Sequence, residues 1–401
     1  MQRFFKKVLE KLIEGLLMIS SSVTTLTVLL IIFYLFKEAS GVFISTPMEK
    51  GFSLLINTQN PVSKLKSEQT KNIFDGNITN WKEVGGNDAE IELFRIDDIS
   101  NYFTDEELGE NFEHLPDKVD EYIEKHPAVI AFIPDKYILA NANSKKIFFD
   151  NITLKSLITA KDWFPTAQPV SQFGILPLIL GTFWVSFGAI ALALPFGLAA
   201  AIYMAEIADL RVRNILKPLI ELLAGIPSVV YGFFGLVVIV PFIQKLFNLP
   251  VGASALAGSI LLGIMALPTI ITISEDAIKN TPRSMKEASL ALGANKWQTI
   301  LRVIIPYSIS GISAAVILGI GRAIGETMAV LMVTGNAAVI PHSFLEPVRT
   351  IPATIAAELG EASFGGLHFK MLFFLGCILF IITLLINFSV ELIAPRRRTE
   401  R

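Results

Sequence analysis

Two charged residues interrupt a long apolar stretch, the segment ILGIGRAIGETMAV of residues 317–330. Arg322 and Glu326 stand four positions apart, a spacing that places two side chains on the same face of a helix. A charge at the centre of a bilayer is costly unless it is paired or faces water. Two interpretations remain open: an internal salt bridge that locks the helix, or a pathway in which Arg322 attracts an anion and Glu326 positions or neutralises its guanidinium group.

The second interpretation suits a tetrahedral oxyanion, because a guanidinium group offers a planar fork of donors that matches phosphate oxygens. Three nearby glycines, Gly319, Gly321 and Gly325, predict close helix packing through Gly-x-x-x-Gly. The sequence has no Gly-x-x-x-x-Gly-Lys-Ser/Thr motif, no ligand-spaced histidine cluster and no nucleophile–base arrangement. We therefore expect neither a cofactor or metal site nor an enzyme.

The composition indicates which elements must position this pair. Of the 401 residues, 52% are hydrophobic and 17% are charged, whereas soluble domains usually carry about 25% charged residues. Six apolar stretches reach the length of about 20 residues that a membrane-spanning helix needs, so the sequence predicts an all-α polytopic membrane protein. The six stretches are Leu16–Phe36, Ile175–Met204, Ile226–Leu246, Gly252–Ile273, Val303–Thr334 and Met371–Ile393.

The first stretch is interpreted as a retained anchor, since it is longer than the apolar core of a signal peptide and no small-x-small cleavage site follows. Lys and Arg gather before it, between the second and third stretches, between the fourth and fifth, and after the last. Because cytoplasmic loops carry such an excess, both termini are expected in the cytoplasm and residues 41–172 outside it. Residues 37–172 contain 14 Lys and Arg against 22 Asp and Glu, a net charge of about −8 that suits a solvated domain.

Residues 41–165 are too many for a simple loop and predict a small α/β domain. The segments FSLLINT, AEIELFRI and AVIAFIP are expected strands, whereas SKLKSEQTKNIFDG, capped by Ser63 or Ser67, and PDKVDEYIEKHP are expected helices. The segments SEQTKNIFDGNITNWKEVGG and PAVIAFIPDKYI resemble part of the phosphate-binding proteins of bacterial importers. That resemblance implies a ligand loop at FRIDDISNYF, which offers Arg95 and Asp97 but lacks the usual Ser-Gly-rich turn. We interpret the domain as a docking or gating cap rather than a working ligand site.

A polar segment between the fourth and fifth stretches predicts a short helix near residues 282–296. Thr281 is expected to cap it, with Pro282 at its first position and Gly293 at its end. The segment resembles the signature of membrane subunits in ATP-binding-cassette importers: Glu-Ala-Ala, three residues, Gly, nine residues, Ile-x-Leu-Pro. The resemblance implies that this helix inserts into a cytosolic ATPase and that the loop around residues 287–306 transmits the closure of the ATPase. The matching residues are Glu287, Ala288, Ser289, Gly293 and Pro306.

The segments GRAIGETMAVLMVTGN, LKPLIELLAGIPSVVYGFFGLVVIVP and FGILPLILGTFWVSFGAIALALPFGLAAAIYMAE resemble the permeases of phosphate-specific importers, PstC type. The resemblance covers almost everything from Trp163 onwards and implies that Arg322, Glu326 and Thr327 line the phosphate path. It also implies a type I importer of the bacterial inner membrane. The implied partners are a second, PstA-like permease, a homodimeric PstB-like ATPase, a PstS-like phosphate-binding protein and membrane lipid, with no nucleic acid.

This resemblance divides the chain into three parts. Residues 1–40 form a cytoplasmic segment and the first span, residues 41–165 an extracytoplasmic insert, and residues 166–401 a permease core with five spans. Within the core, Pro227 and Ser228 in AGIPSVVYG are either a packing kink or a hinge that opens and closes the path.

Three competing functions remain open. One is a permease for another oxyanion, molybdate or sulfate, which an arginine alone does not distinguish from a phosphate permease. The second is an anion-sensing receptor, which six spans and an ATPase-docking signature argue against. The third is an ion-driven secondary transporter, disfavoured because the sequence has no apparent inverted repeat.

Overall fold

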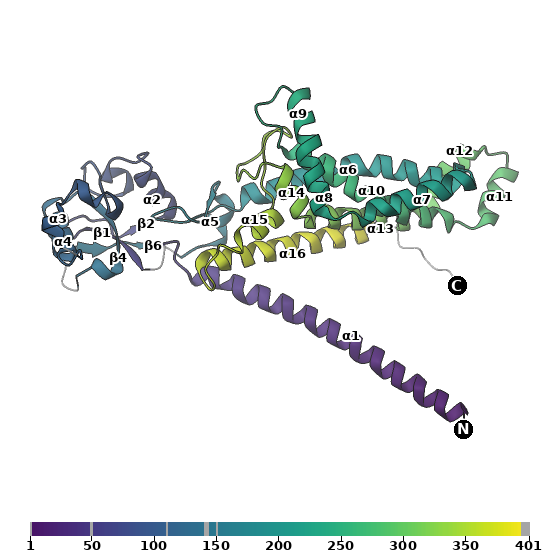
Figure 1. Ribbon diagram of the computed structural model, residues 1–401, viewed down its shortest axis with the longest axis horizontal. Helices are drawn as coiled ribbons and strands as arrows, with labels where there is room; N and C mark the ends of the chain where they lie inside the picture. Colours follow the sequence, from purple (N-terminus) through teal and green to yellow (C-terminus); the bar gives the residue numbers. More distant parts are fainter. Residues whose placement is uncertain (1, 49–50, 110, 140–143, 150, 394–401) are drawn as a thin grey trace. The chain divides into compact units, whose positions relative to one another are not determined.

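The computed structural model describes residues 2–48, 51–109, 111–139, 144–149 and 151–393. The chain divides into two compact units (Figure 1). Residues 41–174 form one, called here the α/β unit, and residues 1–40 with 175–401 form the other, called the membrane unit.

The α/β unit is built on a four-stranded sheet in the order β3-β4-β1-β5. Strand β4 (Val129–Pro134) runs parallel to β3 (Glu92–Arg95) and antiparallel to β1 (Phe52–Asn57), whose other edge pairs with β5 (Ser144–Lys146). The two central strands are nearly continuous apolar runs because both of their faces are covered. The remaining elements are η1 (Gly41–Ile44), β2 (Lys64–Leu65), α2 (Ser67–Phe74), η2 (Trp81–Val84), η3 (Ile96–Asn101), α3 (Asp105–Leu108), α4 (Leu115–Lys125), η4 (Asp135–Tyr137), β6 (Phe148–Phe149), α5 (Leu154–Thr159), β7 (Trp163–Phe164) and β8 (Gln172–Phe173).

The helix caps of the α/β unit differ from the sequence-based expectation at one point. Helix α2 begins after Lys66, so neither Ser63 nor Ser67 is its cap. Instead, the Gln69 side chain caps the start of α2 by accepting a 3.0 Å hydrogen bond from the Lys66 N–H. The expected end of the helix is correct, since Gly76 follows it with a positive φ of 76°.

Among the described residues, six helical segments are long and apolar enough to cross a membrane, as the sequence predicts. They cover residues 11–44, 176–207, 228–246, 255–279, 296–325 and 367–389. The elements of the membrane unit are α1 (Gln2–Ser40), α6 (Leu176–Ile202), η5 (Tyr203–Ile207), α7 (Leu210–Gly225), α8 (Ser228–Phe234), η6 (Gly235–Ile239), α9 (Val240–Leu246), α10 (Ala255–Lys279), α11 (Arg283–Ala291), α12 (Lys296–Thr299), η7 (Ile300–Ile304), α13 (Ile305–Gly325), α14 (Met328–Val333), α15 (Ile351–Glu358) and α16 (Leu367–Ile393).

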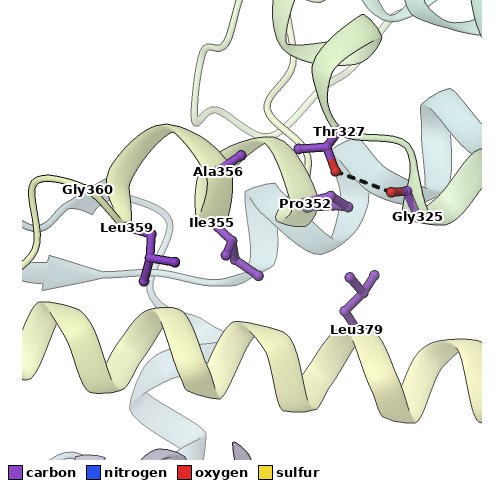
Figure 2. Close-up of a pocket in the computed structure, with 8 residues that line it drawn as sticks. All are labelled: Gly325, Thr327, Pro352, Ile355, Ala356, Leu359, Gly360 and Leu379. Carbon is purple, nitrogen blue, oxygen red and sulfur yellow. Dashed lines mark hydrogen bonds between the residues drawn. The ribbon is translucent and has the colours of Figure 1, made fainter. Parts of the chain in front are cut away.

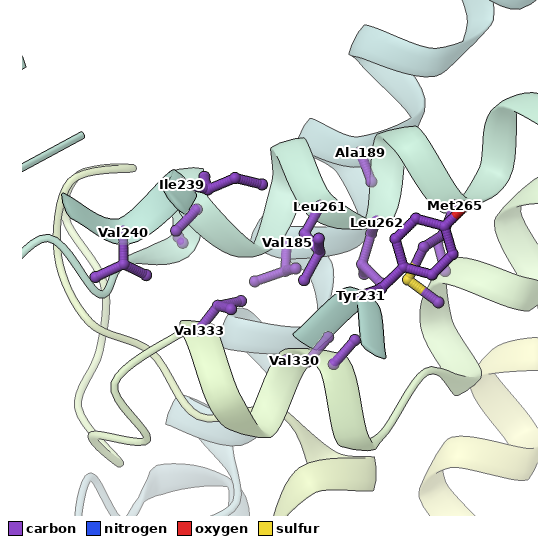
Figure 3. Packing of buried hydrophobic residues seen from close by; sticks show 14 of the residues in the cluster. Val185, Ala189, Tyr231, Ile239, Val240, Leu261, Leu262, Met265, Val330 and Val333 are labelled. Carbon is purple, nitrogen blue, oxygen red and sulfur yellow. The ribbon is translucent and has the colours of Figure 1, made fainter. Parts of the chain in front are cut away.

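Helix α10 is the centre of this unit, and α6 and α13 pack along it (Figure 1). Small residues let the backbones approach closely, as expected where lipid gives helices no hydrophobic reason to associate. A Cβ on Gly197 of α6 would lie 2.8 Å from Ile270, and one on Gly319 of α13 would lie 3.0 Å from the same residue. Figure 3 shows the apolar core that results, in which Val185 and Leu261 meet side chains of α8 and α14.

Candidate functional site

The segment that carries Arg322 and Glu326 is a broken helix. Helix α13 ends at Gly325, Glu326 is extended with φ −70° and ψ 134°, and α14 begins at Met328. The expected continuous helix over Val303–Thr334 is therefore wrong. The Glu326 carboxylate stabilises the interruption, because its Oε1 accepts a 3.3 Å hydrogen bond from the Ala329 N–H, one of the free donors at the start of α14.

The two charged side chains do not bond to one another. Glu326 directly follows α13 and keeps a helical φ of −70°, so it leaves the helix on the face predicted from its spacing, but its carboxylate bonds the Ala329 N–H of α14 instead of Arg322. The described residues contain no Arg322–Glu326 ion pair, and Arg322 has no other carboxylate partner among them. The interpretation as an internal salt bridge is not supported by the structure.

Contacts between α13 and α10 show at which level along α10 Arg322 lies. Gly311 of α13 lies against Ala277 near one end of α10, and Gly319 lies against Ile270. The two helices are thus antiparallel, and Arg322 falls opposite the middle of α10. Beyond the break the chain continues along the same helix, since Thr334 lies against Gly258. A half-buried cation with no ion-pair partner among the described residues therefore sits beside a break, opposite the middle of α10.

A cavity of about 520 Å³ opens at this break (Figure 2). Gly325 and Thr327 form one wall, and the Thr327 hydroxyl donates a 3.3 Å hydrogen bond to the Gly325 carbonyl. Ile355 of α15 and Leu359 directly after it face Leu379 of α16 across the cavity, and most of the lining is apolar. Irregular backbone at membrane depth is tolerated where it is buried in protein or lines a water-filled space, which fits this position.

Of the three glycines predicted to allow close helix packing, only Gly319 lies against another helix of this chain among the described residues. A Cβ on Gly321 or Gly325 would meet nothing within 4 Å, whereas Gly319 does pack against α10. The α13 surface at Gly321 and Gly325 therefore has room for an added side chain.

The residues proposed as a hinge lie between helices. Helix α7 ends at Gly225, Pro227 is extended with ψ 143°, and Ser228 is the first residue of α8. The expected kink inside one helix is thus a complete break. Tyr231 bridges it, since its hydroxyl donates a 2.8 Å hydrogen bond to the Leu223 carbonyl.

The signature segment forms the short helix α11 and the turn that follows. Pro282 is its cap, whereas the Thr281 hydroxyl instead forms a 3.0 Å hydrogen bond with Ser308, so the predicted threonine cap is wrong. Gly293 follows the helix with a φ of 83°, as predicted. The other signature residues are Glu287 and Ala288, both exposed, Ser289, half-buried, and Pro306, exposed near the start of α13.

Helix α11 buries none of its residues. Large apolar side chains around it face outwards, with Leu290, Leu292 and Trp297 exposed by 52%, 89% and 60%. Exposed apolar residues in this number suit a surface that another protein covers.

The loop proposed in the α/β unit uses its arginine structurally. Arg95 donates a 2.8 Å hydrogen bond to the Phe74 carbonyl at the end of α2 and lies 5.3 Å above the Phe74 ring. Asp97 is exposed in η3. Just after β4, the Asp135 carboxylate accepts hydrogen bonds from the Ser53 hydroxyl and from Lys146. Both bonds, that from Ser53 more strongly, lower the pKa of the Asp135 carboxyl and keep a negative charge there. None of these arrangements concentrates positive charge for an anion.

Sequence reasoning missed three ion-pair groups in the membrane unit. Only the Glu275–Lys279 spacing of four residues could have indicated one of them. The other partners are far apart in the sequence or lie across a turn between helices. The groups are Arg213 and Lys279 with Glu275, Lys286 with Glu206, and Arg349 and His368 with Glu358.

Among the described residues, six candidate spans, a cation without an ion-pair partner at a helix break and an exposed connecting helix suit a membrane transport subunit. Residues 193–399 match the family model described as "Binding-protein-dependent transport system inner membrane component", and residues 40–175 match that of the "PBP superfamily domain". The chain belongs to the family of binding-protein-dependent transport system inner membrane components. It is the permease component of an ABC transporter, a multi-pass inner membrane protein rather than an enzyme, and such permeases work with an ATPase and a binding protein.

Several relatives are similar over more than half of the chain. The "Probable ABC transporter permease protein YqgH" of Bacillus subtilis is 42% identical over 60% of this chain and 78% of its own length. The "Phosphate transport system permease protein PstC" of Mesorhizobium japonicum is 40% identical over 58% of this chain and 75% of its own. Among solved structures, the inward-facing MetNI methionine ABC transporter matches 55% of this chain and 95% of its own, with 18% identity and a TM-score of 0.44.

Proposed function

We propose that this chain is the PstC-type permease of an ATP-driven importer of inorganic phosphate. The observation that carries the proposal is the position of Arg322, which has no ion-pair partner among the described residues and lies opposite the middle of α10, beside the break at Glu326 and Thr327. A cation left without a partner in hydrocarbon is strongly unfavourable, so water, an anion or another subunit must compensate it. The names of relatives such as the Mesorhizobium japonicum permease support phosphate as the anion.

The surfaces left free around the break support a path completed by a second permease. A Cβ added at Gly321 or Gly325 would meet nothing within 4 Å, and the cavity beside Thr327 is mainly apolar. A helix of a PstA-like permease would cover these surfaces, and Arg322 and Thr327 would then face a path shared by the two subunits. Discontinuous helices of this kind form the substrate sites of many transporters near the bilayer midplane.

Transport would proceed by alternating access. Both termini and α11 lie in the cytoplasm in this proposal, and the α/β unit lies outside, where it docks or gates rather than binds phosphate. ATP binding closes the homodimeric ATPase, which moves α11 through Glu287 and its neighbours. The core helices then open outwards and accept phosphate from a PstS-like binding protein, with the break at Pro227 and Ser228 as a hinge. Hydrolysis restores the inward-facing state.

The direct test is phosphate uptake by Arg322→Ala and Arg322→Lys variants in the assembled complex. Loss of a charge that contacts the anion costs about 2 kcal/mol or more, so Arg322→Ala should lower uptake by about 30-fold or more. Arg322→Lys should retain part of it, since the charge stays but the planar fork is lost.

The matched control is Arg211→Ala, which removes an exposed arginine near the start of α7. It should leave uptake within about twofold of wild type, as for most surface changes. Co-purification of the other subunits establishes that each variant assembles. Normal uptake by an assembled Arg322→Ala complex contradicts the path.

A further inference from the structure

Helix α11 is attached to the rest of the membrane unit by polar contacts. In this helix, which the structure describes in full, only Lys286 and Ser289 are not exposed. Both are the residues that bond to neighbouring elements. With no buried apolar face, α11 lacks the packing that normally fixes a helix to a core.

The two contacts lead to different places. The Ser289 hydroxyl lies 3.0 Å from the Thr299 hydroxyl, which joins α11 to α12 directly after it in the chain. Lys286 Nζ donates a 2.5 Å hydrogen bond to Glu206 Oε1, across 80 positions of sequence. The lysine and glutamate side chains are only 22% and 13% exposed. The Lys286–Glu206 contact therefore joins α11 to the span of residues 176–207, which is distant in the sequence.

Glu206 lies in η5, the π-helical turn that continues α6. Its neighbours in η5 and α6 pack on an apolar cluster with α10, η7 and α13, formed by Ala201, Ile278, Ile300, Ile304 and Ile312. Helix α6 also follows α10 closely, since a Cβ on Gly188 would overlap Ser259 and one on Gly197 would lie 2.8 Å from Ile270. A displacement applied at Glu206 is thus passed to a closely packed helix pair rather than to a loop.

We propose that the Lys286–Glu206 ion pair is the connection through which movement of α11 is transmitted to α6 and α10, and hence to the path. The inference rests on the proposed function, because it names the link between the ATPase-facing helix and the path. The Ser289 contact reaches α6 only indirectly, through α12 and the apolar cluster that η7 shares with α6, whereas the ion pair joins α11 directly to η5 and α6. The mostly buried pair holds both elements, and loss of either charge leaves the other without its partner.

The test measures coupling in proteoliposomes that contain the complete complex with its binding protein. Phosphate uptake and ATP hydrolysis are followed together for Lys286→Glu, Glu206→Lys and the double variant with the charges exchanged. Each single variant should still co-purify with the ATPase at the wild-type ratio. The phosphate transported per ATP should fall by about 10-fold or more, within the usual range of coupling between sites. The charge-exchanged double variant should recover most of that ratio.

The matched control is Arg213→Gln, which removes another partly buried ion pair, the one between α7 and Glu275 of α10 at 3.3 Å. It lowers stability without touching α11, so the transport ratio should remain close to wild type. Single variants with a wild-type ratio overturn the inference, and so does a double variant as defective as the singles. A wild-type complex that hydrolyses ATP and takes up sulfate or molybdate but no phosphate overturns the proposed substrate instead, and the same ratio is then measured with that anion.

Discussion

A single glycine decides whether α6 can approach the segment that follows the helix break. A Cβ on Gly181 would overlap the backbone carbonyl of Arg349, an atom that cannot swing aside as a side chain can. The same contact region places the Thr182 hydroxyl 3.0 Å from the Ile351 N–H, which caps the start of α15 together with Thr350. Close backbone approach at this residue therefore fixes the position of α15 and with it one wall of the cavity.

Gly181→Ala should destabilise the chain by about 1–3 kcal/mol, the range for overpacking a tight interior. Gly321→Ala is the matched control, because a Cβ there meets nothing within 4 Å in this chain. The measurement is the thermal unfolding midpoint of each purified variant in detergent. A Gly181→Ala midpoint equal to that of Gly321→Ala would contradict the close approach.

The sequence singles out Arg322 as a candidate site residue but does not reveal which groups surround it. The cost of a charge in an apolar stretch marks the residue without any structure. The spacing of four residues predicts a pair with Glu326, but the Glu326 carboxylate bonds the Ala329 N–H beyond the break instead of the guanidinium group. Hydropathy remains high through the break, so a sliding window does not reveal it. The Lys286–Glu206 pair has no sequence signal, since its members lie 80 positions apart.

At the scale of helices and strands, local sequence patterns predict individual elements but not the contacts between distant ones. The strands β1, β3 and β4 and the helices α2, α4 and α11 follow from alternation, periodicity and glycine stops, all of which are local patterns. Their pairing order in the sheet depends on contacts between distant segments. The α7–α8 break at Pro227 was only partly foreseen, because proline and glycine indicate an interruption but not its extent.

At the scale of the helix, α11 gives a second test of the ATPase-docking role. Glu287 is exposed and has no ion-pair partner among the described residues, so it is free for another protein. Glu287→Lys should weaken ATPase binding and remove the stimulation of ATP hydrolysis by phosphate-loaded binding protein, because a like-sign contact across an interface costs several kcal/mol.

Glu361→Lys is the control for this charge reversal. It makes the same change at another exposed glutamate, in the turn between α15 and α16 at the opposite end of the membrane unit. Stimulated ATP hydrolysis should be normal in this variant. Unchanged stimulation and transport in Glu287→Lys would count against docking through α11.

Across the whole molecule, charge is distributed unevenly in the α/β unit. Residues 97–124 hold 11 of the 22 acidic residues between positions 37 and 172 but only one of the 14 Lys and Arg. A segment with this charge repels phosphate, which agrees with docking or gating rather than phosphate binding as the role of the unit. The cation that faces an anion in this account is in the membrane unit, where Arg322 has no partner among the described residues.

The measurement that tests the central claim most directly is phosphate uptake by proteoliposomes that contain this chain with its partner permease, ATPase and binding protein. Radiolabelled phosphate is supplied with ATP on the ATPase side and challenged by excess unlabelled phosphate, molybdate or sulfate. The account predicts uptake that requires ATP and is blocked only by unlabelled phosphate. Absence of phosphate uptake, or equal competition by molybdate or sulfate, would contradict the assignment of phosphate as the substrate.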